Sequence, residues 1–112
     1  MAMPSASAPE ASGLVEVADD EDATLVSCAG EIDESCNGSL DRAVGLVTAA
    51  RASTIIVDFT EVTFVGSIGL GFIARLYRMA DLAGRTLTVR NPSPQARRVL
   101  DICGFADMIT ID

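Results

Sequence analysis

One segment of the chain places a single hydroxyl group at the point where a predicted helix begins. Residues 55–71 are predicted to form a buried strand, a loop and the first turn of a helix that starts at Ser67. A helix N-terminus presents unpaired backbone N–H groups and the positive end of the helix dipole. A serine there can cap the helix, and a phosphate on it would be electrostatically favoured. Ser67 is therefore a candidate regulatory switch, with a plain helix cap as the alternative.

The composition argues against an enzyme. The chain has no histidine and no lysine, and all eight of its basic residues are arginines. The commonest general base is therefore absent. The glycines at 66, 69 and 71 do not have the spacing of a dinucleotide fingerprint, and the segment lacks the lysine and hydroxyl of a P-loop. We expect no catalytic residue, no metal site and no cofactor.

The net charge of −8 is unevenly distributed. The first 22 residues hold six of the 16 acidic residues and no base, whereas the other ninety residues hold ten acids and eight arginines. An acidic chain without a basic stripe does not fit a nucleic-acid-binding protein.

The three cysteines, Cys28, Cys36 and Cys103, are odd in number and far apart in apolar surroundings. This pattern predicts buried free thiols in a reducing compartment.

The first 13 residues predict a leader rather than part of the fold. They are rich in Ala, Ser and Pro, and they lack the basic and apolar regions of a signal peptide. This composition is typical of a disordered segment. No apolar stretch approaches the roughly 20 residues needed to cross a membrane. We therefore expect a cytoplasmic protein with a disordered leader at 1–13, one domain at 14–112 and no membrane partner.

Periodicity in the first half of the domain predicts a hairpin and a helix. Leu14–Ala18 and Thr24–Gly30 alternate apolar with small or polar residues, which favours two antiparallel strands. Apolar residues then recur at steps of three and four over about Glu34–Ala50, as on the buried face of a helix. Asp33 or Ser35 could cap this helix.

The second half begins with the strongest strand. Thr54–Phe59 is an unbroken run of β-branched and aromatic residues, typical of a strand covered on both faces. A loop over Thr60–Gly66 should lead into a helix over Ser67–Ala83 that ends at Gly84.

The apolar arc of this second helix is wider than one buried face requires. Either the helix is sandwiched inside the fold, or part of the arc, with Leu76 and Met79, contacts a partner. Arg75 and Arg78 mark its expected solvent side.

The end of the chain predicts one more strand, helix and strand. Thr86–Arg90 alternates as a strand, and Ser93 and Pro94 are typical of the cap and first residue of a helix that continues to about Ile102. Met108–Ile111 should form a last short strand. The whole order predicts an α/β fold with a mixed sheet of four to five strands and about three helices packed over it.

Three segments, in this order, resemble parts of STAS domains, the sulfate transporter and anti-sigma factor antagonist family. Residues 57–71 resemble the family's phosphoacceptor segment, residues 30–33 its loop after the second strand, and residues 91–105 its last helix and turn. The resemblance covers about Leu14–Asp112, and it implies the same α/β fold.

The resemblance also implies a function. In anti-sigma factor antagonists, the unphosphorylated protein binds an anti-sigma factor, usually one that is also a serine kinase, and so frees a sigma factor. Phosphorylation of the matching serine, here Ser67, ends that binding, and a phosphatase is a possible further partner. The alternative is a constitutive, non-phosphorylated STAS module that serves as a scaffold or accessory subunit of a signalling or transport complex.

The phosphosite loop of Gly66, Ile68 and Gly69 departs from the family pattern at two places. Many phosphorylatable members have an aspartate before the serine and a second hydroxyl after it. Ile68 leaves Ser67 as the only hydroxyl between residues 65 and 71. Gly66 removes a carboxylate that would repel a phosphate, but also a group that a kinase could use to orient the hydroxyl. Its other possible role is to permit a positive φ angle in the turn.

Three acidic residues have both a structural and a functional interpretation. The resemblance implies that Asp33 meets an arginine of the anti-sigma factor with Glu31 as its companion on the rim, while the plain alternative for Asp33 is a helix cap. Asp58 ends a central strand, where open sheets place ligands. A lone acid there is more often a loop-capping group.

Overall fold

The computed structural model describes residues 13–20 and 22–112, so the expected leader lies outside the described residues except for Gly13. Two helical segments are 3-10 turns. In chain order the elements are β1 (Leu14–Asp19), β2 (Ala23–Ile32), the 3-10 turn η2 (Glu34–Cys36), α1 (Asn37–Ala49), β3 (Thr54–Val65), α2 (Ser67–Ala83), β4 (Thr86–Arg90), α3 (Pro94–Ile102), the 3-10 turn η3 (Phe105–Asp107) and β5 (Thr110–Ile111).

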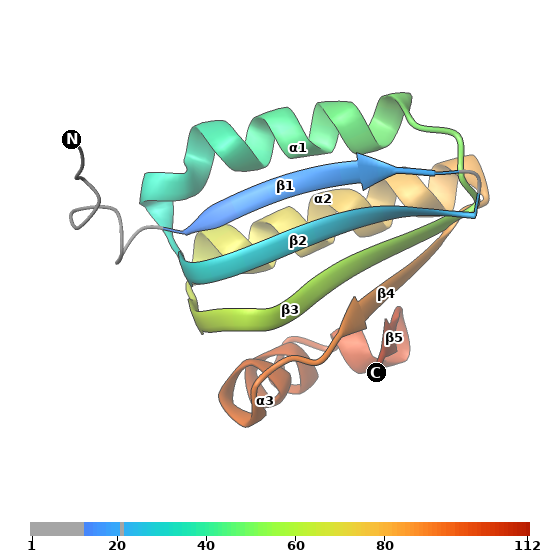
Figure 1. The fold of residues 1–112 in the computed structure, drawn as a ribbon. Coiled ribbons are helices and arrows are strands. Elements are labelled where there is room, and N and C mark those ends of the chain that lie inside the picture. Colours follow the sequence, from blue (N-terminus) through green and yellow to red (C-terminus); the bar gives the residue numbers. More distant parts are fainter. Residues whose placement is uncertain (1–12, 21) are drawn as a thin grey trace, which may run out of the picture.

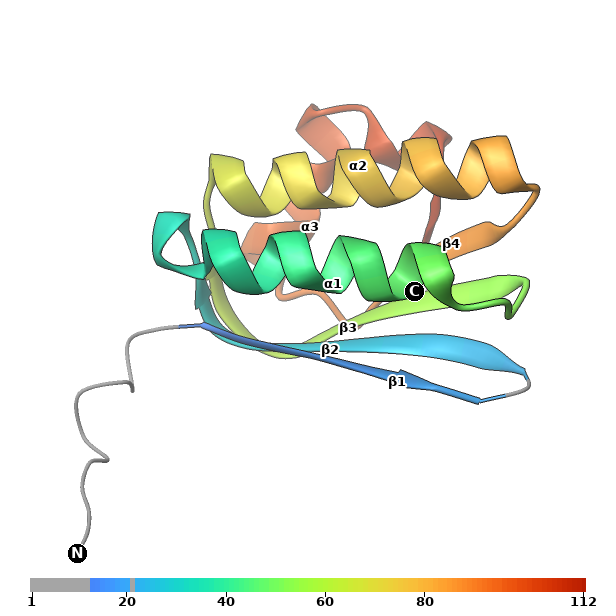
Figure 2. The same cartoon turned by 90° about the horizontal axis from the view of Figure 1, so that it is seen from above.

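The five strands form one mixed sheet in the order β1-β2-β3-β4-β5. β1 and β2 are the expected antiparallel hairpin, and the three other pairs are parallel. α1 and α2 lie side by side over one face of the sheet, whereas α3 lies beyond the end of β4 (Figures 1 and 2). The predicted α/β fold is confirmed.

The core lies between the sheet and the two long helices. Alternate residues of the central strands face α1 and α2, as the period of a strand requires. The fully buried side chains include Val26, Ile55, Val57, Phe59 and Val89 from strands, and Leu40, Val47, Phe72, Ile73 and Leu76 from helices. In the part of the chain that the structure describes, no helix combines the length and apolar character that crossing a membrane requires.

The wide apolar arc of α2 is accounted for mainly by packing, because α2 contacts both the sheet and α1. Leu76 has no exposed surface and belongs to the core. The expectation that Leu76 contacts a partner is therefore wrong, because it lies on the same side of the helix as the buried Phe72. Arg75 and Arg78 are exposed, as expected, and Met79 is half-buried.

The largest departure from the expected boundaries is the length of β3. The loop expected over Thr60–Gly66 is strand as far as Val65. β3 pairs with β4 only as far as Asp58, but it continues beside β2 through two register shifts, each of which adds one residue to β3. These bulges bend the strand. Its exposed polar residues hid this extension from the sequence pattern.

Smaller differences occur at two helix and strand ends. The first helix begins with the 3-10 turn Glu34–Cys36 before α1 starts at Asn37. The last strand covers only Thr110–Ile111, because the residues before it include the 3-10 turn η3. The expected bounds of α2 and β4 are confirmed.

Two glycines of α2 should respond in opposite ways to alanine. A Cβ at the buried Gly69 would lie 2.8 Å from Val65 Cγ1 and 3.1 Å from Ile32 Cγ2, whereas a Cβ at Gly71 would meet nothing within 4 Å. We expect Gly69→Ala to lower the free energy of unfolding by about 1–3 kcal/mol through overpacking. Gly71→Ala should raise it by about 0.5–1 kcal/mol. Urea unfolding measures both, and equal effects would contradict this account of Gly69.

Candidate functional site

Ser67 is the first residue of α2, and its side chain is exposed. The cap position is Gly66, whose carbonyl accepts the first helical hydrogen bond from Leu70 N at 3.1 Å. Among the described residues no side chain caps α2. The plain interpretation of Ser67 as a helix cap is therefore wrong, because Ser67 lies one position too late. Its hydroxyl stands at the helix start without a capping role.

Gly66 is not required for a positive φ angle. Its φ of −91° and ψ of −173° are extended backbone that any residue adopts, so that expectation is wrong. The side-chain space at Gly66 is instead restricted by a neighbour, since a Cβ would lie 3.3 Å from Phe64 Cε2. The aromatic ring of Phe64 therefore packs beside the backbone that leads into Ser67.

The end of β2 brings two expected site residues to the same edge as Ser67. Gly66 N donates to Ile32 O at 2.9 Å, and Glu31 lies opposite Phe64 in the β2–β3 register. Ile32 is followed by Asp33 just as Gly66 is followed by Ser67. The structure thus places Glu31, Asp33 and the phosphosite loop together, and we call this region the Ser67 edge.

Asp33 also has a local structural role. Its Oδ1 accepts hydrogen bonds from Ser35 N at 3.0 Å and from Ser35 Oγ at 2.6 Å, so it caps the 3-10 turn η2. The Ser35 hydroxyl, followed by the Ser35 backbone N–H, lowers the pKa of Asp33 below the ordinary value. The expected cap is confirmed. The carboxylate therefore remains charged at neutral pH on the rim of the Ser67 edge.

The Ser67 edge carries acidic side chains from the end of β2. Glu31, Asp33 and Glu34 lie at and directly after the end of β2. The next acid along the chain, Asp41, is paired with Arg75 at 2.7 Å. A phosphate on Ser67 would add about −1.5 to −2 charges to this rim. The acidic rim suits a positively charged partner surface. Because a phosphate makes the rim more negative still, it can weaken binding only through its bulk and the cost of its dehydration in a close interface.

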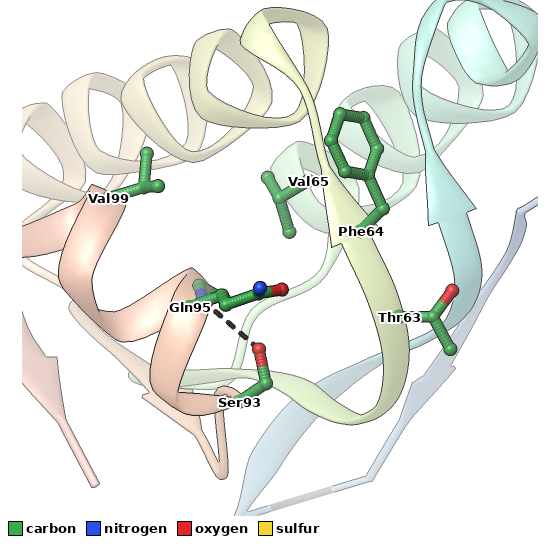
Figure 3. A pocket seen from close by; sticks show the side chains of 7 residues that line it. Thr63, Phe64, Val65, Ser93, Gln95 and Val99 are labelled. Atoms are coloured by element: carbon green, nitrogen blue, oxygen red, sulfur yellow. Dashed lines mark hydrogen bonds between the residues drawn. The ribbon is translucent and has the colours of Figure 1, made fainter.

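A groove of about 320 Å³ adjoins this edge (Figure 3). It is lined by Thr63, Phe64 and Val65 of β3 and by Ser93, Gln95, Ala96 and Val99 at α3. The groove lies where the extension of β3 no longer has β4 beside it. The groove was not predicted from the sequence, because this extension was expected to be a loop. The β-branched and aromatic run Val62-Thr63-Phe64-Val65 was the available signal of a strand.

Figure 3 shows the two sides of the β3 extension at the groove. Val65 points toward α3, while the ring of Phe64 projects from the other side of the strand, next to the turn into α2. At the α3 end, Ser93 Oγ accepts a hydrogen bond from Ala96 N at 3.1 Å. The expected cap at Ser93 is confirmed.

Asp58 fixes the point where β3 parts from β4. Its Oδ1 accepts hydrogen bonds from Thr60 N at 2.9 Å and Thr60 Oγ1 at 2.6 Å, and Asn91 Nδ2 donates to Thr60 Oγ1 at 3.1 Å. The Thr60 hydroxyl is the main cause that lowers the pKa of Asp58, and the Thr60 backbone N–H and the charge of Arg90 add to it against partial burial. The loop-capping interpretation of Asp58 is confirmed.

Met79 does not lie at the Ser67 edge. It comes twelve residues after Ser67, which corresponds to about 18 Å along the axis of α2. Met79 instead belongs to a second, shallow surface that we call the α2 patch. The patch is lined by Val44, Arg75, Arg78, Met79, Leu82 and Ala83.

The three cysteines are free. Cys28 and Cys36 are buried, and burial is the main cause that raises the pKa of Cys28 to about 12. Cys103 is exposed, so the expectation of a third buried thiol is wrong. It follows the last turn of α3 as its C-cap, where the chain is open to solvent.

Residues 15–112 match the family model of the STAS domain, so the match includes nearly all of the described fold. The chain belongs to the STAS family.

Curated relatives of this STAS domain are named as antagonists of anti-sigma factors. The anti-sigma-F factor antagonist RsfB of Mycobacterium tuberculosis is 38% identical over 68 residues, which are 61% of this chain and 55% of the relative. This match therefore spans little more than half of that relative's length. The anti-sigma-B factor antagonist of Bacillus subtilis is 31% identical over 98 residues, which are 87% of this chain and 88% of the relative.

Solved structures of the same kind share the fold. A crystal structure of an anti-sigma factor antagonist from Mycobacterium paratuberculosis has a TM-score of 0.79 and 30% identity, and covers 94% of this chain and 88% of its own. SpoIIAA in its unphosphorylated form has a TM-score of 0.75 and 19% identity, with 88% of both chains covered. The phosphorylated form of SpoIIAA from Bacillus has a TM-score of 0.64 and 20% identity, with 88% of this chain and 91% of that chain covered. The SpoIIAA likeness shows the fold alone.

The carboxylate of Asp58 should make stability depend on pH in acid. Because folding lowers its pKa, its contribution is fully present above the ordinary carboxyl pKa and is lost as pH falls through the lowered value. We expect Asp58→Ala to lower the free energy of unfolding by about 1 kcal/mol at pH 7. The difference from wild type should shrink as the pH approaches 3.

Urea unfolding at several pH values measures this difference. Glu61→Ala removes an exposed carboxylate from the same strand and is the control, with an expected change below about 0.5 kcal/mol. A loss at Asp58→Ala that stays constant down to pH 2 would contradict the role of the charge.

Proposed function

We propose that this STAS domain is an anti-sigma factor antagonist, which binds an anti-sigma factor and thereby releases a sigma factor. The names of its relatives support this function. The single observation that carries it is the exposed hydroxyl of Ser67 at the start of α2, on the edge that also holds the carboxylates of Glu31 and Asp33. The protein acts by binding rather than by catalysis. It acts in the cytoplasm, a reducing compartment that suits its free cysteines.

Phosphorylation of Ser67 by a serine kinase switches this binding off. The anti-sigma factor itself is the proposed kinase, and a phosphatase restores the binding form. The start of α2 offers backbone N–H groups to a phosphate, and Gly66 places no competing carboxylate at the cap. The same phosphate would require dehydration inside a close interface. One modification can therefore be tolerated by the domain and rejected by its partner.

The proposed contact surface has two parts. Glu31 and Asp33 form the acidic rim of the Ser67 edge and meet basic side chains of the anti-sigma factor. Met79, in the α2 patch, is a second contact about 18 Å along the helix. A partner that covers both parts must extend along the exposed side of α2.

The alternative function is a constitutive STAS module that serves as a scaffold or accessory subunit of a signalling or transport complex. Gly66 favours it, because the aspartate that many phosphorylatable members carry is absent from the cap position. In that case Ser67 stays unmodified in the host. Mass spectrometry of the protein from its host, grown with the kinase present, distinguishes the two functions by the presence of phosphate on Ser67.

Substitutions of Ser67 test the switch directly. We expect Ser67→Glu to weaken binding to the anti-sigma factor of the same host at least tenfold, because a larger, charged side chain would have to lose its hydration in a close interface. Ser67→Ala should bind within twofold of wild type. Isothermal titration calorimetry with the purified anti-sigma factor measures both affinities. Equal affinities of the two variants would refute the switch.

Charges introduced into α2 distinguish contact from core. Met79→Glu should leave cooperative thermal unfolding intact and weaken binding to the anti-sigma factor several-fold, because Met79 is half-buried at the surface. Leu76→Glu places a charge in the core and should cost more than about 4 kcal/mol, enough to abolish cooperative unfolding. Thermal melting and calorimetry measure the two effects. A folded Met79→Glu that binds like wild type would remove the α2 patch from the interface.

A further inference from the structure

We propose that Phe64 is the apolar anchor through which the Ser67 edge binds the anti-sigma factor, an inference that rests on the proposed function. The chain has four phenylalanines, and three of them are at most 6% exposed. Phe64 is 54% exposed and lies three residues before Ser67. Large aromatic side chains provide much of the binding energy of protein interfaces. An exposed ring beside the phosphoacceptor is therefore available for a partner.

The backbone that carries the ring is held in place before any partner arrives. Phe64 belongs to β3 and lies opposite Glu31 in the register with β2, so its backbone is fixed by strand pairing. Its Cε2 atom packs over Gly66, where a Cβ would come within 3.3 Å. The strand pairing leaves little backbone freedom to be lost when the ring is covered, and such preorganisation favours binding.

The surroundings of the ring define the chemistry of the partner surface. Glu31 lies opposite the ring in β2, and Asp33 follows the end of that strand. These two carboxylates give the anchor an acidic rim. The complementary surface on the anti-sigma factor is an apolar pocket flanked by arginine or lysine side chains.

An anchor at Phe64 also explains why a change at Ser67 reaches the interface. Only Val65 and Gly66 separate Phe64 from Ser67. In this proposal, a partner pocket that covers the ring also covers the serine and excludes water from it. A phosphate in that space would lose its hydration, which is costly for a charged group. Burial of the Phe64 ring by the partner and phosphorylation of Ser67 therefore exclude each other.

The absence of tryptophan from the chain provides a direct test. Phe64→Trp introduces a single indole at the anchor, and its fluorescence reports whether that position becomes buried. We expect a blue shift and reduced acrylamide quenching when the purified anti-sigma factor of the same host is added. The double variant Phe64→Trp with Ser67→Glu should show neither change at the same concentration.

Affinity measurements complete the test. Phe64→Ala should weaken binding at least tenfold in calorimetry, while thermal melting confirms that the variant is folded. Ile102→Ala is the matched control, since Ile102 is an apolar side chain, 77% exposed, at the end of α3. It should bind within twofold of wild type.

The possible results separate the anchor from the function on which it rests. Binding of the Phe64→Trp variant without a change in its indole fluorescence, or binding of Phe64→Ala as tight as that of wild type, would overturn the anchor and leave the proposed function standing. Failure of every purified anti-sigma factor of the host to bind the wild-type protein would overturn the proposed function, and the anchor with it.

Discussion

The pairing of β2 with β3 beyond the end of β4 is the constraint on which the rest of this structure depends. It continues through two bulges to Ile32 and Val65, and it closes with the hydrogen bond from Gly66 N to Ile32 O. This last bond fixes where β3 ends and where α2 begins. The sheet thus determines the position of Ser67 and the start of α2.

Several features of the Ser67 edge follow from this one pairing. Because β2 and β3 are parallel, their carboxyl ends lie together, and the residues that follow each strand share one edge. Because β4 parts from β3 after Asp58, the extension of β3 is left with an open side, where α3 forms the groove. Because α2 starts so close to both strands, its first turn has room only for glycine at position 69.

The sequence was sufficient to predict the fold and the main elements of the edge. Period and capping residues gave the bounds of α2 and the caps at Asp33 and Ser93, because these depend on local interactions. The extension of β3 could not be predicted in this way, because polar residues such as Thr60 and Thr63 point to solvent while the backbone pairs with a distant strand. The sequence also could not predict which apolar residues of α2 are buried and which remain at the surface. The separation of Leu76 from Met79 depends on the packing of α1 against α2.

Gly66 affects both the start of α2 and the packing of the Phe64 ring. Its extended backbone would accept an aspartate, and an aspartate at a cap position would occupy the N–H groups at the start of α2. With glycine, those groups are not taken by a side chain, and the ring of Phe64 lies against the bare backbone instead. The residue that departs from the family pattern therefore changes two properties at once, since it leaves the helix start open to an anion and supports an exposed aromatic beside it. Losing the aspartate does not by itself remove the physical basis for a phosphorylation switch.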